Sequence, residues 1–283
     1  MGGEQVKILR VLNNNAVVVK HGELEKIIFG AGIGFQKGKN DPVNQQKIEK
    51  IFSMEENTPK FEQLLKTLPL EVIEMGEEII SYAEGEMHLP LSDHVHISII
   101  DHLAFALERI KQGFPIENKL LHEIKALYQE EFRIGLWAVQ KIKKDLDIEL
   151  PEDEAGHIAL HLHTAKLQTG SMEDTMQRTS LIQDLIQIVE ERANLELSEQ
   201  GMSYHRLVVH LNFALSRAEE EKVFDDMDPD MLDLVQTKYK KAYDIAYEIA
   251  NYVRQETGLP FPLPEIGYIA LHIQRILSNQ SMS

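Results

Sequence analysis

Five of the twelve histidines lie in sequence blocks that occur twice. The block HLAFAL at residues 102–107 returns as HLNFAL at 210–215, and EAGHIALH at 154–161 returns as EIGYIALH at 265–272. A chemical role built into the repeated unit would use the histidines that both copies keep. These are His102, His161, His210 and His272.

A repeated histidine of this kind is a candidate phosphoacceptor. Its neutral imidazole, with an ordinary pKa near 6.5, is a competent nucleophile at neutral pH. On a helical wheel, His102 lies about 20° outside Val95, at the margin of an apolar stripe, where a side chain is both oriented and reachable. A single histidine there is more often a partly buried structural residue. Four at duplicated positions favour a shared chemical role.

Metal binding is the competing interpretation of the same histidines. His157 and His161 are four residues apart, so they would share one helical face. The second copy has Tyr268 at the position of His157, and the pattern is lost. We therefore expect no metal site and no other cofactor.

An arginine follows the first histidine of each copy by seven residues, at Arg109 and Arg217. Seven residues make about two helical turns, so each arginine would lie on nearly the same face as its histidine. Such a side chain could pair with a phosphate, or it could belong to a solvated face. The sequence leaves both possibilities open.

The elements that carry these residues change character near residue 60. Short β-branched or aliphatic runs at residues 6–12, 16–20 and 24–29, and another that ends at 52, are separated by turn residues, which predicts an antiparallel sheet. Farther on, Val95, Ile99, Leu103, Ala106 and Ile110 form one stripe of an amphipathic helix, and similar spacing continues to the C-terminus. Most prolines lie between such segments, where we expect them to end helices.

The predicted fold class is therefore multidomain, β followed by all-α. A small antiparallel sheet domain at residues 1–60 precedes two homologous helical bundles at 61–172 and 173–283. About 50 residues of sheet form a weak core alone, so we expect the sheet domain to dimerise.

Composition bounds the classes of function. The chain has no cysteine, which excludes disulfides and thiolate metal sites. We find no signal segment and no apolar run of membrane-spanning length, and we expect a cytoplasmic protein without membrane insertion. The net charge of -17 argues against nucleic-acid binding by the chain as a whole, but residues 1–50 hold eight Lys or Arg against five Asp or Glu.

Four motifs, in this order, carry a family resemblance: LNNN at 12–15, GAGIGFQK at 30–37, DHLAFALERIKQG at 101–113 and EAGHIALHLH at 154–163. With them the chain resembles, along its whole length, the BglG/SacY family of transcription antiterminators, and most of all the branch that controls the glucose permease. The resemblance implies a dimeric N-terminal domain that binds an RNA hairpin overlapping a terminator. It also implies two phosphotransferase regulation domains, phosphorylated at His102, His161, His210 and His272.

The same resemblance implies partners and RNA-binding positions. The phosphoryl donors would be the EIIB domain of the sugar permease, of glucose type, and the phosphocarrier protein HPr. The residues expected to contact RNA are Arg10, Asn13, Asn15, Gly30 and Phe35. Amides and an aromatic ring suit unpaired bases, which are read by edge hydrogen bonds and stacking. Relatives place a basic residue where this chain has Ala31, a loss that Lys37 or Lys39 could offset.

Two other classes of protein compete with this interpretation. A DNA-binding regulator would need an N-terminal helix-turn-helix, whereas residues 1–50 predict strands. A phosphotransfer enzyme could use the histidines as carriers, but the loop from Gly30 to Gly34 is followed by no helix start and no Gly-Lys-Ser/Thr end. We therefore expect a regulator and not an enzyme.

Overall fold

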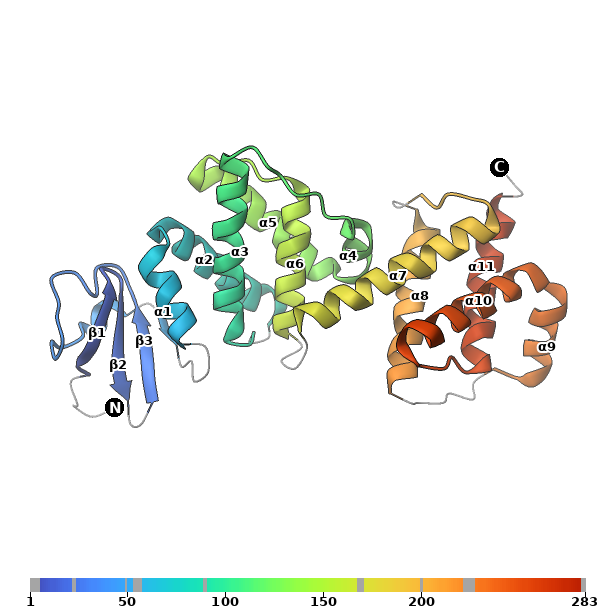
Figure 1. Cartoon of the computed structure of the whole chain (residues 1–283), viewed down its shortest axis with the longest axis horizontal. Coiled ribbons are helices and arrows are strands. Elements are labelled where there is room, and N and C mark those ends of the chain that lie inside the picture. The colour runs from blue at the N-terminus through green and yellow to red at the C-terminus, as the bar shows by residue number, and fades with distance from the viewer. Residues whose placement is uncertain are drawn as a thin grey trace. The chain divides into compact units, whose positions relative to one another are not determined.

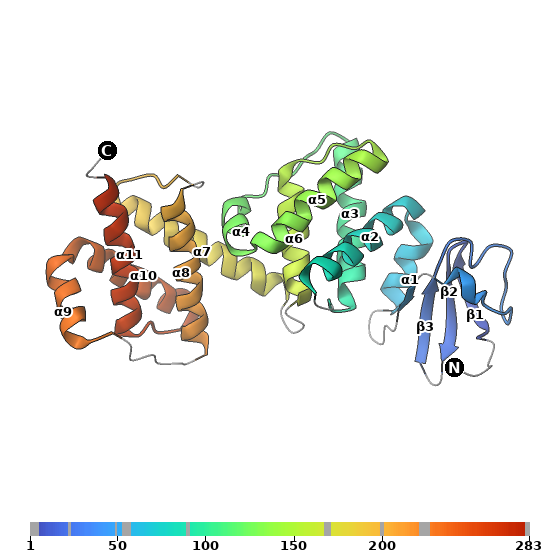
Figure 2. The same cartoon turned by 180° about the vertical axis from the view of Figure 1, so that it is seen from behind.

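The chain folds into two units, each with hydrophobic core residues of its own. The computed structural model describes residues 6–21, 24–48, 50–52, 58–88, 91–166, 171–198, 201–220 and 227–280. The first unit comprises Met1–Glu117 and Glu130–Gly170, and the second comprises Asn118–Gln129 and Ser171–Ser283. Figure 1 and, from behind, Figure 2 show a sheet followed by helices, which is the predicted fold class.

The first unit begins with a four-stranded antiparallel sheet in the order β1-β2-β3-β4. The strands are β1 (Ile8–Asn13), β2 (Ala16–His21), β3 (Leu24–Phe29) and β4 (Lys50–Phe52). A 3-10 turn, η1 (Gln45–Lys47), lies in the connection between β3 and β4. The strand positions agree with the predicted runs because turn residues bound each of them.

Both faces of this sheet are apolar, because its strands carry hydrophobic residues on both sides of the pleat. Val17, Val19 and Ile28 pack on one face with Ile33 and Val43 from the β3–β4 connection. On the other face, sheet residues such as Val18 and Ile27 share a core with helical residues. Those helical residues are Phe61, Leu64, Leu65, Ile73, Ile97 and Ile100.

Five helices complete the first unit: α1 (Thr58–Thr67), α2 (Leu70–Met87), α3 (His94–Lys111), α5 (Gln129–Leu146) and α6 (Glu152–Lys166). In both views α1 lies between the sheet and the remaining helices. The predicted stripe of α3 is confirmed: Val95, Ile99, Leu103 and Ala106 are buried. Helix α2 ends at His88 in the left-handed conformation.

The second unit contains α7 (Met172–Ala193), α8 (Met202–Glu219), α9 (Pro229–Lys238), α10 (Lys240–Thr257) and α11 (Leu263–Gln280) around a core of its own. A capping box between Ser171 and Asp174 starts α7, and Gly258, with φ of 77°, ends α10. Within the described residues, no helix is both long and apolar enough to cross a membrane.

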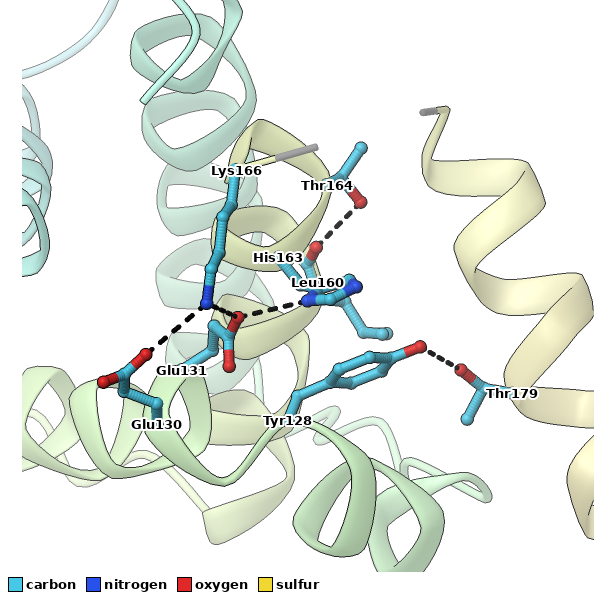
Figure 3. A network of polar contacts seen from close by, with 8 residues as sticks. All are labelled: Tyr128, Glu130, Glu131, Leu160, His163, Thr164, Lys166 and Thr179. Atoms are coloured by element: carbon cyan, nitrogen blue, oxygen red, sulfur yellow. Dashed lines mark hydrogen bonds and ion pairs between the residues drawn. The ribbon is translucent and has the colours of Figure 1, made fainter. Parts of the chain in front are cut away.

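The short helix α4 (Leu121–Leu127) also belongs to the second unit, although it lies in the first sequence repeat. Tyr204 on α8 donates a buried hydrogen bond of 2.7 Å to Oε1 of Glu123. The hydroxyl of Tyr128, at the end of α4, is 3.2 Å from the hydroxyl of Thr179 on α7, as Figure 3 shows. Helix α4 thus docks on α7 and α8.

The expectation that prolines end helices was wrong for three of them. Pro59, Pro229 and Pro264 lie in the first turns of α1, α9 and α11. The first turn has no hydrogen-bond acceptor for its N–H groups, so a residue without an N–H fits there. Pro90 lies outside the described residues.

Candidate functional site

The first two repeated histidines meet on neighbouring helices. His102 lies on α3 and His161 on α6, and their ring centroids are 5.0 Å apart. The ring of His157, one turn before His161, is 5.6 Å from that of His102. Each of the three side chains is partly exposed, so this cluster lies at the surface of the bundle.

A buried carboxylate anchors the cluster. Glu154, at the start of α6, has no exposed surface. Its Oε2 lies 3.0 Å from Nε2 of His102, and its Oε1 accepts a hydrogen bond of 2.8 Å from Arg109. Burial raises the pKa of Glu154, but His102, His157 and Arg109 outweigh burial and hold that pKa below its usual value. The carboxylate therefore stays ionised at neutral pH.

The other imidazoles of the cluster are neutral at neutral pH. Burial lowers the pKa of His161 to about 3, with further contributions from His102 and His157. Burial also lowers the pKa of His157, and His102 adds to the effect. A neutral ring keeps a nitrogen lone pair, which a nucleophile requires.

The second repeat brings together the corresponding pair. His210 on α8 stacks on His272 of α11, with ring centroids 3.6 Å apart. Burial lowers the pKa of His272 to about 4, and His210 and Arg275 add to the shift. Burial followed by Arg217 lowers the pKa of His210.

The repeated carboxylate has different partners in the two copies. Glu265 corresponds to Glu154, but Arg217 binds both of its oxygens, at 2.5 Å each. Arg109 and Arg217, left open by the sequence, thus each bind a buried glutamate. Both glutamates lie in the repeated blocks, so the repeat carried the signal for them, although sequence reasoning did not single them out.

Two other histidines of the first unit, His163 and His96, also lie against carboxylates. Nδ1 of His163 lies 3.1 Å from Oε1 of Glu131, which Lys166 also approaches, as Figure 3 shows. Nδ1 of His96 lies 2.8 Å from Oε1 of Glu77. Over the part of the chain that the structure describes, no group of three or more His, Asp or Glu residues could hold a metal ion.

A second candidate site lies at one end of the sheet, where the asparagine turn meets the glycine loop. Asn15 holds the loop through two contacts: its carbonyl oxygen accepts from the N–H of Gly30 at 2.9 Å, and its Oδ1 accepts from the N–H of Gly32 at 2.5 Å. The N–H of Gly34 binds the carbonyl oxygen of Asn14 at 2.8 Å. A side chain on Gly34 would overlap the backbone of Asn13, so the loop requires glycine there.

The five residues expected to bind RNA differ in their exposure and in the contacts that they already make within the protein. Phe35, in the glycine loop, is 55% exposed, so the possibility that it is a core residue is excluded. Gly30 is buried. Asn13 donates to the carbonyl oxygen of Leu65 and accepts from the N–H of Asn15. Arg10 binds Glu25 and Glu62, at 2.6 Å each.

A lysine that sequence reasoning missed lies at the glycine loop. Nζ of Lys47 is 3.0 Å from the carbonyl oxygen of Gly32, next to Ala31. Lys37 and Lys39 are exposed, and Lys47 is the basic residue that contacts the loop directly. The separation of 15 positions between Lys47 and Gly32 hid this proximity from a sequence pattern.

Comparison with known proteins identifies the domains that carry these residues. A family model described as the CAT RNA binding domain matches residues 6–61, and one described as the PRD domain matches residues 77–165 and 183–276. The chain therefore belongs to the family of transcription antiterminators that join a CAT RNA-binding domain to PRD domains.

Individual relatives cover the chain almost completely. The transcription antiterminator LicT of Bacillus subtilis (strain 168) is 36% identical over 277 residues, 97% of this chain and 100% of LicT. The beta-glucoside operon antiterminator of Dickeya chrysanthemi is 39% identical over 277 residues, 97% of this chain and 98% of its own. The crystal structure of GlcT CAT-PRDI is 33% identical with a TM-score of 0.53, and the match covers 57% of this chain and 98% of that one.

Proposed function

We propose that this protein prevents transcription termination by binding an RNA hairpin that overlaps a terminator in the leader of a sugar permease transcript. Phosphorylation of His102, His161, His210 and His272 controls this activity in the cytoplasm. The observation that carries the proposal is that each repeat brings its two histidines together, in a chain that begins with a CAT RNA-binding domain.

The RNA surface that we propose comprises Arg10, Asn13, Asn15, Gly30 and Phe35. Among them Phe35 is best placed to stack on an unpaired base, because its ring is exposed on a loop that Asn15 holds in place. The side chains of Asn13 and Asn15 already form hydrogen bonds within the protein. They therefore stabilise the shape of the RNA surface as well as form part of it. Arg10 reaches RNA after it releases its carboxylate partners.

Substitution of Phe35 tests the RNA assignment. Phe35→Ala should weaken hairpin binding by about 1–3 kcal/mol, the cost of losing one stacked base. Phe114→Ala is the matched control, since Phe114 is 67% exposed and lies after α3. Electrophoretic mobility shifts at one fixed salt concentration measure both variants. Equal binding by both would contradict the assignment.

Phosphorylation of the histidines would regulate RNA binding. A phosphate on His102 brings close to two negative charges next to Glu154, a carboxylate that is already ionised. Like charges repel, so we expect the phosphate to change the contact among His102, Glu154 and Arg109. Helix α3 carries this change toward the sheet, because its residues Ile97 and Ile100 pack in the core beneath the sheet.

The donors that we propose are the phosphocarrier protein HPr and the EIIB domain of the sugar permease. Mass spectrometry after incubation with phosphorylated HPr alone, and then with EIIB added, assigns each histidine to a donor. His102→Asp, which adds a negative charge, should reduce terminator readthrough in transcription assays. Unchanged readthrough would contradict inhibition through His102.

The active species that we propose is a homodimer. A two-fold protein suits a hairpin with two similar halves. Light scattering coupled to size exclusion, with and without the RNA hairpin, measures the oligomeric state. A monomer bound to one hairpin would contradict the dimer.

Two sugars are candidates for the controlled permease. The sequence motifs resemble the glucose branch, whereas identity is higher to the beta-glucoside operon antiterminator, at 39%, than to GlcT CAT-PRDI, at 33%. Phosphorylation by the EIIB domains of a glucose permease and of a beta-glucoside permease, compared at equal concentration, decides between them. The faster donor identifies the sugar.

A further inference from the structure

The two candidate phosphoacceptors of the first repeat present different ring nitrogens to solvent. Nε2 of His102 and Nδ1 of His161 are buried, and neither has a hydrogen-bond partner in the described part of the chain. The opposite nitrogen of each ring is not buried in this way, although both rings lie in one cluster. The nitrogens that remain for a phosphoryl donor are therefore Nδ1 of His102 and Nε2 of His161.

The carboxylate of Glu154 lies against the buried Nε2 of His102. Its Oε2 is also buried without an aligned hydrogen bond, and the two atoms are 3.0 Å apart. A small rotation of the ring would align Nε2–H with Oε2. Because Arg109 holds the Oε1 atom, the carboxylate is fixed in position and Oε2 remains for the histidine. A carboxylate there keeps the proton on Nε2, which leaves the lone pair on Nδ1.

His161 has no such partner, and burial alone decides which nitrogen is used. Its Nδ1 faces the interior of the bundle, so only Nε2 can approach a donor phosphorus in line. The low pKa of the ring keeps it unprotonated at neutral pH, in agreement with this geometry.

We propose that phosphorylation produces two isomers, with the phosphate on Nδ1 of His102 and on Nε2 of His161, and that Glu154 is the positioning residue that fixes the first. This inference rests on the proposed function, since it specifies the atoms of that modification.

The transfer to His102 balances with a phosphohistidine donor of the phosphocarrier class. The donor N–P bond breaks as the Nδ1 lone pair of His102 forms the new N–P bond. A donor ring that carries a proton on its far nitrogen leaves as neutral imidazole with the bonding electrons. The positive charge passes to the His102 ring, where Nε2–H faces the Glu154 carboxylate. No other reactant is needed.

The second repeat supplies a matched control residue. Glu265 is buried in the same way as Glu154, but both of its oxygens bind Arg217. Glu265→Gln and Glu154→Gln therefore both remove a buried carboxylate from an arginine, and only Glu154→Gln also removes it from a candidate phosphoacceptor of the first repeat.

The first experiment determines the isomer directly. Two full-length variants keep one histidine each: His161→Asn/His210→Asn/His272→Asn retains His102, and His102→Asn/His210→Asn/His272→Asn retains His161. After incubation with phosphorylated HPr or EIIB, isomer-specific antibodies and ³¹P NMR identify the product. We expect 1-phosphohistidine, on Nδ1, at His102 and 3-phosphohistidine, on Nε2, at His161. The opposite isomer at either position overturns the assignment there.

The second experiment tests Glu154 in the variant that retains His102. Glu154→Gln should slow phosphorylation about 10-fold and give a mixture of isomers, whereas Glu265→Gln should change neither. Glu154→Asp should restore the single isomer in part. Circular dichroism shows that each variant is folded. A slower reaction with an unchanged isomer would show that Glu154 is only a structural residue. That result would overturn its proposed role in fixing the isomer at His102. If His102 and His161 accept phosphate from neither donor, the proposed function itself fails.

Discussion

Single residues of this protein gain their chemical character from neighbours that are distant in sequence. The repeated histidines were predictable, because a duplicated position points to a duplicated role. Their partners were not: Glu154 meets His102 and Arg109 across 52 and 45 residues of chain. Spacing along one helix cannot show which carboxylate of another helix enters a site. Folded coordinates are needed for that.

Lys47 offers a prediction at the same scale. Its ammonium group lies at the glycine loop, near Ala31, where the family resemblance implies a basic residue. If it neutralises one RNA phosphate, Lys47→Ala should reduce the slope of log K against log[salt] by about 0.7 to 1. Lys20→Ala, on β2, is the control. An unchanged slope in Lys47→Ala would remove this lysine from the interface.

His161 predicts a dependence of stability on pH. Its pKa of about 3 in the folded state lies below the unfolded value near 6.5. Above pH 6.5 neither state binds the proton, so the histidine has no effect on the pH profile. Between pH 6.5 and about 4 the unfolded chain takes up the proton first, and stability falls by at most about 1.4 kcal/mol per pH unit.

His161→Asn should flatten that profile below pH 6.5 and leave it unchanged near pH 8. The fluorescence of the single tryptophan, Trp137 on α5, reports urea unfolding of the first unit. Parallel profiles of variant and parent between pH 6.5 and 4 would show that the ring protonates freely in the folded state.

At the scale of elements, the sequence predicted most of the helices and strands but not their tightest contacts. Turn residues and apolar periodicity determine where β3 and α3 lie, and both agree with expectation. The close crossing of α5 and α6 has no such signal. There Gly135 lies against the backbone of Ala155, the residue after Glu154. This crossing fixes the position of α6 relative to α5 and therefore the position of Glu154.

Gly135→Ala tests the crossing. Its new methyl group would overlap the carbonyl oxygen of Ala155, and we expect a loss of about 1–3 kcal/mol from the free energy of unfolding. Gly85→Ala is the control, because nothing lies within 4 Å of the position in α2. There alanine should stabilise the helix by about 0.5–1 kcal/mol. Trp137 fluorescence measures both, and a stabilising Gly135→Ala would exclude the tight crossing.

At the scale of the whole molecule, the compact units do not coincide with the sequence repeats. The repeat predicts two helical domains divided near residue 172, whereas the segment Asn118–Gln129 packs with the second unit. The sequence pattern does not show that α4 packs with the second repeat. The buried bond between Tyr204 and Glu123 shows the partner. The domain boundaries at 60 and 172 stay a prediction.

Tyr204→Phe tests the docking of α4. The variant removes the donor to a buried carboxylate, and we expect a cost of about 1–3 kcal/mol to local stability. Hydrogen exchange of the α4 amides should accelerate accordingly. Tyr252→Phe, which loses a bond to Asp184 at a more exposed place, should leave α4 unchanged. Equal exchange in both variants would show that α4 is held by apolar packing alone.

The shared core under the sheet also affects how fragments of this protein behave. Ile97 and Ile100 of α3, together with Phe61 of α1, form part of that core. A fragment that stops at residue 60 would leave the underside of the sheet, including Val18 and Ile27, open to water. Such a fragment would bury that apolar surface against another copy of itself, or it would aggregate. The association constant of such a fragment would then reflect the apolar face that truncation exposes. Dimerisation should therefore be measured on chains that extend at least through α3.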